Sequence, residues 1–150
     1  MRSAHRRDSR PHSIETAGFT LMELMVVVSI IAILSTIAYG SYQRHVVKSR
    51  RAAAAACLQE RVQRLERFHT AHMSYLDSSG KPPELAQCAD GLAQHYQLSL
   101  SAVAARTFKL RAEPLGGQAE ADARCGALMI DQRGVRSVSG AAAATPEECW

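Results

Sequence analysis

The sequence predicts an α+β protein in which one long amino-terminal α-helix packs on a small antiparallel β-sheet. Three observations predict this fold. An apolar run at residues 19–39 leads into apolar positions at helical spacing, a cluster of Ser, Gly and Pro at residues 77–83 ends that pattern, and short alternating segments follow. A chain of 150 residues leaves room for one modest domain beside the apolar run.

The apolar run extends from Phe19 to Tyr39, and Glu23 is the only charge among its 21 residues. At ~1.5 Å per residue, a helix of this length spans the ~30 Å hydrocarbon core of a bilayer. A charge at such a place costs roughly 2.5–3.5 kcal/mol on insertion scales, which favours a functional role for Glu23. The alternative is a glutamate that snorkels to the headgroups, because Glu23 lies only four residues after Phe19.

Beyond Gly40 the helical pattern resumes. We expect one helix from about Phe19 to about Met73, its second half covered on one face by the globular domain. Glu60 and Arg64 stand four residues apart on the other side and are expected to pair. The predicted buried face consists of residues three or four apart: Leu58, Val62, Leu65, His69, His72 and Leu76.

Short segments after residue 94 predict three or four antiparallel strands. Asp131 to Gly134 has the composition of a hairpin turn, in which Gly134 can take a positive φ. In Thr107–Ala112 the residues Phe108, Leu110 and Ala112 alternate toward a core. The other expected strands are His95–Leu100, Ala127–Ile130 and Val135–Val138, and the expected turns are Asp90-Gly91 and Leu115-Gly116-Gly117.

Four cysteines, Cys57, Cys88, Cys125 and Cys149, are spaced by 31, 37 and 24 residues. Without a CxxC pair, a zinc ribbon or a thioredoxin-like redox site is disfavoured. Two structural disulfides in an oxidising compartment are the simpler interpretation. Four cysteines allow three connectivities, and the spacing alone does not choose among them.

No motif for a catalytic nucleophile or a phosphate-binding loop is present, so we expect no enzyme, no catalytic residue and no cofactor. His69 and His72 have a spacing that fits a metal, but no further ligand joins them, and a packing role is favoured. Basic residues at 106–111 and 133–136 raise the alternative of nucleic-acid binding. A solvated strand face is the simpler account, because few aromatic residues are available for stacking on bases.

Residues 1–18 carry four arginines against Asp8 and Glu15, a net charge of +2. The positive-inside rule keeps such a segment in the cytoplasm and sends the following domain outward. A rival interpretation is a secretory signal cut after Thr36-Ile37-Ala38, ahead of Tyr39. Glu23 argues against it, because it would interrupt the apolar region of that signal.

The run from Gly18 to Val28, Gly-Phe-Thr-Leu-Met-Glu-Leu-Met-Val-Val-Val, closely resembles the amino-terminal signature of type IV pilins and pseudopilins. The resemblance implies cleavage by prepilin peptidase between Gly18 and Phe19 and N-methylation of the new Phe19 amino group. It also implies that Glu23 pairs with the amino terminus of a neighbouring subunit. More weakly, the chain looks similar to the minor pilins called PilE-like in these segments: Tyr42-Gln43, Lys48–Ala52, Leu65–Phe68, Cys125-Gly126 and Cys149-Trp150.

This resemblance implies a leader peptide at 1–18, a hydrophobic transmembrane or filament-core helix at 19–40, and a globular pilin domain at 41–150. It favours a Cys125–Cys149 disulfide that closes the carboxyl-terminal loop, which leaves Cys57 for Cys88. The implied protein is a minor structural subunit of a type IV pilus, serving adhesion and twitching motility.

The implied partners are other pilin subunits, prepilin peptidase and the pilus assembly machinery. The expected location is the bacterial inner membrane, as a single-pass precursor with a periplasmic globular domain, and then the pilus on the cell surface. The alternatives are a pseudopilin of type II secretion, or a receptor for DNA or another ligand at the pilus tip.

Overall fold

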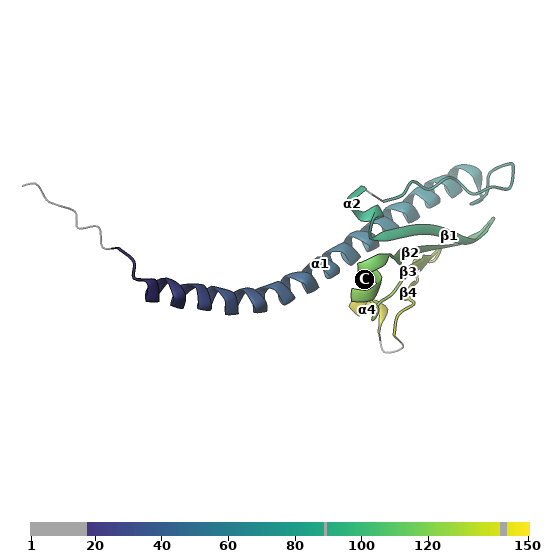
Figure 1. The fold of residues 1–150 in the computed structure, drawn as a ribbon. Helices are drawn as coiled ribbons and strands as arrows, with labels where there is room; N and C mark the ends of the chain where they lie inside the picture. Colours follow the sequence, from purple (N-terminus) through teal and green to yellow (C-terminus); the bar gives the residue numbers. More distant parts are fainter. Residues whose placement is uncertain (1–17, 89, 142–143) are drawn as a thin grey trace, which may run out of the picture. The chain divides into compact units, whose positions relative to one another are not determined.

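The computed structural model describes residues 18–88, 90–141 and 144–150. The chain divides into two compact units, Met1–Tyr39 and Gly40–Trp150. Apart from Gly18, the predicted leader lies outside the described residues. The helices and strands follow one another in the order α1 (Leu21–His72), α2 (Asp90–Ala93), β1 (Tyr96–Ala104), β2 (Thr107–Pro114), α3 (Gly116–Ala121), β3 (Leu128–Asp131), β4 (Arg136–Val138) and α4 (Pro146–Cys149). Figure 1 labels all of them except α3.

Helix α1 has recognisable signals at both ends. The backbone N–H of Glu23 donates to the Thr20 hydroxyl oxygen at 3.2 Å, which satisfies one of the free amides of the first turn. At the other end Met73 takes a φ of 54°, in the left-handed region that stops a helix. The observed bounds lie within two residues of the predicted ones.

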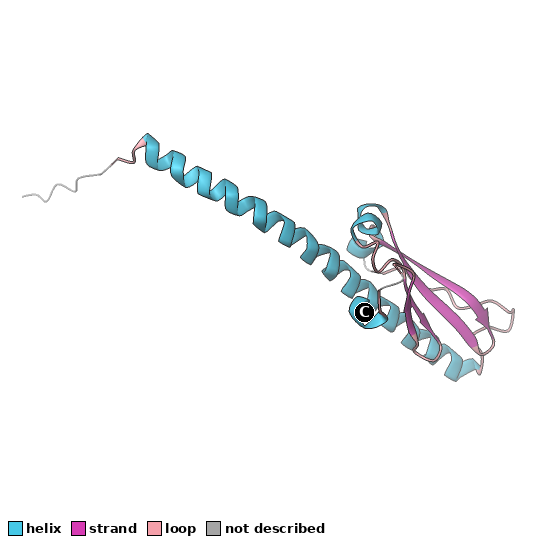
Figure 2. Ribbon diagram, turned by 90° about the horizontal axis from the view of Figure 1, so that it is seen from below, coloured by secondary structure: helices cyan, strands magenta, loops and turns pink. Residues whose placement is uncertain are grey.

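The predicted antiparallel sheet is confirmed, with four strands. They are hydrogen-bonded in sequence order, β1-β2-β3-β4, and every neighbouring pair is antiparallel. The predicted turn between β3 and β4 is also correct, because Gly134 takes a φ of 76° and donates its amide to the Asp131 carbonyl. Figure 2 shows the sheet lying along the part of α1 that belongs to the globular unit.

The core lies between this part of α1 and one face of the sheet. Leu58 and Leu65 of the helix and Leu110 of β2 have no exposed surface. The predicted helix face is wrong at His72, which is exposed. His72 is the last residue of α1, and its ring stacks on Phe68 one turn earlier, with 4.1 Å between ring centroids.

The loop after α1 is tied to the helix by a buried arginine and a disulfide. Arg61 is 7% exposed and donates from Nη2 to the Gln87 carbonyl oxygen at 3.1 Å. Its Nη1 lies 3.4 Å from Glu60 Oε1, so Glu60 pairs with Arg61 and the predicted pairing with Arg64 is wrong. The Cys57–Cys88 disulfide joins the same two segments, with 6.0 Å between Cα atoms.

Two expected turns are short helices in the structure. Asp90-Gly91 begins α2, and Gly116-Gly117 begins α3. The second is held by its buried Gln118, whose Nε2 donates to the Val47 carbonyl oxygen of α1 at 3.1 Å. A tertiary contact thus fixes as a helix a segment that its two glycines would leave flexible.

Candidate functional site

The amino-terminal unit presents an exposed apolar helix surface. Among the described residues, α1 is the single helix that is long and apolar enough to cross a membrane, by length and composition alone. Phe19 is 81% exposed and Ile37 is 69% exposed. An apolar surface of this extent needs lipid or another protein to cover it.

Glu23 lies in the first turn of this helix. Its backbone amide is capped by Thr20, and its carboxylate has no hydrogen bond or ion pair within the described part of the chain. A carboxylate near a helix amino terminus is favoured by the helix dipole. Its side chain is exposed, together with that of Phe19, and it can accept a cation supplied from outside the subunit.

Within the globular unit, a buried polar network joins α1 to the segment around α3. Arg51 forms an ion pair with Asp122, whose side chain is 3% exposed. The Tyr96 hydroxyl donates to Asp122 Oδ2 at 3.0 Å, and Gln118 Nε2 donates to the Tyr96 hydroxyl oxygen at 3.1 Å. Burial raises the pKa of Tyr96 well above its usual value, and the charge of Asp122 adds to this rise.

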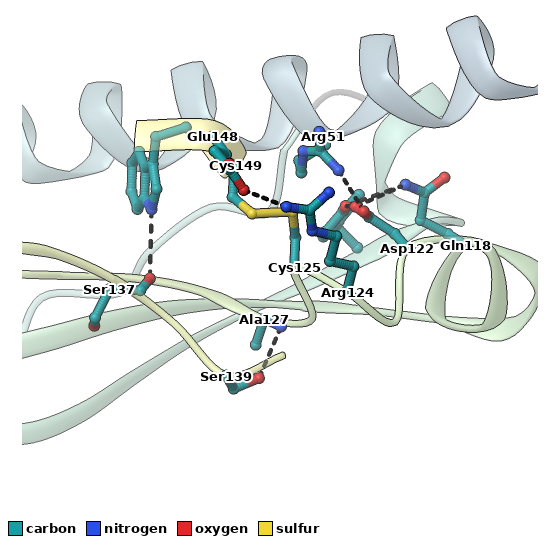
Figure 3. Close-up of a disulfide and its surroundings, with 12 residues drawn as sticks. Arg51, Gln118, Asp122, Arg124, Cys125, Ala127, Ser137, Ser139, Glu148 and Cys149 are labelled. Atoms are coloured by element: carbon teal, nitrogen blue, oxygen red, sulfur yellow. Dashed lines mark hydrogen bonds and ion pairs between the residues drawn. A yellow bond between two sulfur atoms is a disulfide. The ribbon is translucent and has the colours of Figure 1, made fainter. Parts of the chain in front are cut away.

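The carboxyl-terminal loop is closed by the second disulfide, Cys125–Cys149, with 5.7 Å between Cα atoms. This confirms the disulfide-closed loop expected from the resemblance. Figure 3 shows the bridge beneath α1, with the Arg124–Glu148 ion pair beside it. The backbone of Gly140 lies so close to that of Arg124 that a Cβ built on Gly140 would lie 2.0 Å from the Arg124 carbonyl oxygen.

The last residue of this loop packs back on the sheet. Trp150 Nε1 donates to the Ser137 carbonyl oxygen at 3.4 Å, and the Arg136 guanidinium lies 5.2 Å from the indole centroid. This is the geometry of a cation–π contact. Arg136 therefore has a local packing role in addition to its charge.

The basic residues that raised the nucleic-acid alternative are partly neutralised. Arg111 forms an ion pair with Glu113, and Arg133 with Asp131. Lys109 lies opposite Asp131 in the β2–β3 register. Burial alone would raise the pKa of Asp131, but the backbone amides of Val135 and Arg133 and the Arg133 guanidinium lower it on balance. The solvated face of the sheet is thus of mixed sign.

The two histidines considered for a metal have other neighbours. The His69 ring lies 4.4 Å from that of Tyr75, and His72 stacks on Phe68. Within the described residues no group of three or more His, Cys, Asp or Glu side chains could hold a metal ion. Contacts with neighbouring aromatic rings account for both histidines.

These features define a class of protein: a disulfide-braced α+β domain on a helix whose exposed apolar half carries one acidic residue. A family model described as type IV minor pilin ComP, DNA uptake sequence receptor, matches residues 40–129, and a model of the prokaryotic N-terminal methylation motif matches residues 16–39. The first covers more than half of the chain, and the chain belongs to this family of type IV minor pilins.

Relatives and solved structures are similar to parts of the chain. Fimbrial protein Q of Moraxella bovis is 32% identical over 105 residues, and the match spans 68% of this chain but 60% of that protein. A type IV pilin from Shewanella oneidensis is 27% identical, with coverage of 69% and 97% and a TM-score of 0.49. The non-core minor pilin PilV of Neisseria meningitidis is 19% identical, with coverage of 68% and 95% and a TM-score of 0.47.

Proposed function

We propose that this chain is a minor structural subunit of a type IV pilus. The observation that carries the proposal is the exposed apolar helix with a single carboxylate, inside a segment that matches the N-terminal methylation motif. Its action is packing and not catalysis. The apolar surface leaves lipid for the interior of a filament, and the globular unit remains at the filament surface.

The proposed maturation begins with a single-pass precursor in the inner membrane, its globular domain in the periplasm. Prepilin peptidase then cuts between Gly18 and Phe19, residues 1–18 are lost, and the new Phe19 amino group is N-methylated. Both residues lie before the first helical residue, Leu21, in a stretch without helical hydrogen bonds. A segment outside the helix suits entry into a protease active site.

Glu23 is proposed to specify the packing of one subunit against the next. An isolated carboxylate is costly in a low-dielectric environment, and an ion pair with a neighbour's cationic Phe19 amino group offsets that cost. Because Coulomb attraction is weakly screened there, the pair supplies register as well as attraction. Thr20 keeps the first turn helical and so fixes the position from which Glu23 projects.

A pilus is favoured over a type II secretion pseudopilus by the family model, which describes minor pilins. The two disulfides fit an oxidising compartment, which the periplasm and the cell exterior both provide. Adhesion and twitching motility are the activities proposed for the assembled filament.

Glu23→Ala tests the proposal directly. The variant should accumulate as processed, folded, membrane-bound subunit but be depleted from sheared pili, because the partner for the neighbouring amino group is lost. Glu120→Ala is the matched control, since Glu120 is an exposed carboxylate of α3 whose side chain makes no hydrogen bond or ion pair within the described residues. Immunoblots of the membrane and sheared fractions measure how much of each variant is incorporated. Normal incorporation of Glu23→Ala would contradict the ion pair and would favour the alternative that the Glu23 side chain only snorkels to the headgroups.

A second candidate function is DNA binding at the pilus, because the matching family model is described as a DNA uptake sequence receptor. Among the basic residues on the sheet side, Arg106, Lys109 and Arg136 lack an ion pair within the described residues, and Arg136 already packs on the Trp150 ring. A gel-shift of the full chain with a short duplex across a salt series would test it. Binding that weakens steeply as salt rises, with a shallower salt dependence in Lys109→Gln, would support a DNA receptor. No gel shift at low salt would exclude DNA binding and leave the structural function alone.

A further inference from the structure

A groove of about 460 Å³ lies entirely within the globular unit, beneath the first turns of α1 after Gly40. Its floor is apolar and includes Val47 and the Cys125–Cys149 disulfide. Its rim is cationic, with Arg44 and Lys48 on α1 and Arg124 on the facing segment. The volume falls in the range of ~300–1,000 Å³ that is typical of sites for small ligands.

The charges around the groove do not balance. Four cationic side chains face two carboxylates, and both carboxylates are already engaged. Asp122 pairs with Arg51, and Glu148 pairs with Arg124. Figure 3 shows the Arg124–Glu148 pair close to the disulfide and the Arg51–Asp122 pair to the right of it.

Arg44 and Lys48 are therefore the surplus charges of the groove. Each is exposed, and neither has an ion pair within the described residues. They stand four residues apart on α1, so their side chains leave the same side of the helix one turn from each other. Two adjacent cations above an apolar floor, where water screens charge weakly, are suited to an anionic group.

The position of this pair along the chain indicates which anion it meets. Tyr39 and Tyr42, 66% and 64% exposed, follow the apolar run in the way that aromatic residues mark a membrane interface. At ~1.5 Å per residue, Arg44 lies about 7.5 Å along the helix from Tyr39, and Lys48 about 13.5 Å. The headgroup layer on each side of a bilayer is ~5–8 Å thick, and long cationic side chains reach back to it.

We propose that the groove binds the phosphate of an anionic phospholipid through Arg44 and Lys48 while the subunit resides in the membrane before assembly. Arg124 faces the same phosphate from the opposite wall, and the apolar floor at Val47 and the disulfide reduces the screening of these contacts by water. This rests on the membrane residence in the proposed function. The bound lipid holds the globular unit against the bilayer surface, and the subunit releases it on entering the filament.

A nucleic-acid backbone fits these observations less well. DNA presents a row of phosphates and needs several cations in line. The groove offers two surplus cations in a concave site of small-ligand size. The single phosphate of a membrane lipid matches the charge of the groove and its place shortly after the apolar run.

The test uses the full chain in mild detergent and native mass spectrometry, which counts bound phospholipid in titrations with phosphatidylglycerol and with zwitterionic phosphatidylcholine. The double variant Arg44→Gln/Lys48→Gln is compared with Arg64→Gln/Arg67→Gln. The second pair removes the same charge from exposed positions of α1 outside the groove. A hydrogen bond to a charged group contributes about tenfold or more to binding, so the groove variant should bind phosphatidylglycerol at least about 100-fold more weakly, and the control should bind like wild type.

Other outcomes overturn the proposal. Equal binding of the two lipids, or an equal loss in both double variants, would show attraction without a site. Inorganic phosphate that binds as tightly as phosphatidylglycerol would point to a free anion as the ligand. A short DNA duplex whose binding is lost in the groove variant while lipid binding is kept would assign the groove to nucleic acid.

Flotation with neutral phosphatidylcholine vesicles separates this proposal from the function on which it rests. A chain that floats with neutral vesicles but has no preference for phosphatidylglycerol retains its membrane anchor and loses only the lipid site. A chain that does not float contradicts membrane residence and, with it, both proposals.

Discussion

Replacing Arg51 by leucine should lower the free energy of unfolding by about 3–5 kcal/mol, because it leaves the buried Asp122 carboxylate without its cationic partner. Asp122 is 3% exposed and Arg51 is 14% exposed, so solvent screens their attraction only weakly. Without Arg51, the Asp122 carboxylate retains the Tyr96 hydroxyl at 3.0 Å and the Gln118 amide at 3.5 Å. Neither neutral group compensates a buried charge.

The assay is denaturant unfolding of the full chain in mild detergent, followed by tyrosine and tryptophan fluorescence. Arg50→Leu is the control, because Arg50 adjoins Arg51 in α1 but has no ion pair within the described residues; its effect should stay within about 0.5 kcal/mol. Arg51→Leu combined with Asp122→Leu should recover most of the loss, since both charges are then gone. Equal effects of Arg50→Leu and Arg51→Leu, or strictly additive losses in the double variant, would refute the reasoning.

Three further changes have definite expected results. Cys149→Ser opens a loop with a sequence separation of 24 and should cost about 3.5 kcal/mol of stability, measured by denaturant unfolding. Gly140→Ala places a Cβ 2.0 Å from the Arg124 carbonyl oxygen and should cost about 3 kcal/mol in the same assay. Burial, followed by the hydrogen bond to Glu66, raises the pKa of Tyr75 to about 12, so stability should fall as pH rises from about 10 to 12, and Tyr75→Phe should reduce that fall.

Each of these expectations has a control. Wild type treated with reductant should be less stable than the Cys149→Ser variant, because reduction also opens Cys57–Cys88, and no change on reduction would contradict stabilising bridges. Gly91→Ala meets no atom within 4 Å and should be neutral or stabilising, whereas equal costs at Gly91 and Gly140 would contradict the close approach. If Tyr75→Phe leaves the loss of stability at alkaline pH unchanged, the pKa of Tyr75 is no higher in the folded state than in the unfolded state.

Patterns local in sequence predicted the elements that depend on local spacing. The apolar run and the recurrence of Leu58 and Leu65 predicted α1, and the alternation around Phe108 predicted β2 with its correct inward face. Asp131 to Gly134 predicted the β3–β4 turn, because its geometry is fixed by four consecutive residues.

Features that depend on distant partners could not be predicted in this way. Arg51 and Asp122 are 71 residues apart, and nothing near either residue indicates that the other neutralises it. From the local sequence, Arg61 would be expected to be an exposed helix residue. It is buried because the Gln87 carbonyl oxygen packs against it and accepts its hydrogen bond. Helix α3 begins with two glycines, and only the tertiary contact of Gln118 makes it helical.

One signal at the candidate site was available and was overlooked. Thr20 and Glu23 have the spacing of a helix capping box, and the structure places the Glu23 amide on the Thr20 hydroxyl oxygen. The start of α1 could therefore have been fixed from sequence at Leu21. The cysteine pairing could not, because the residues alone leave three connectivities open.

The most direct test of the proposed function is mass spectrometry of this chain recovered from sheared pili. The account predicts an amino-terminal peptide that begins at Phe19, carries one added methyl group on its α-amino nitrogen, and is lost from the pilus fraction in Glu23→Ala cells. A chain that is absent from sheared pili of wild-type cells, or that begins at Tyr39 or retains residues 1–18 there, would contradict it.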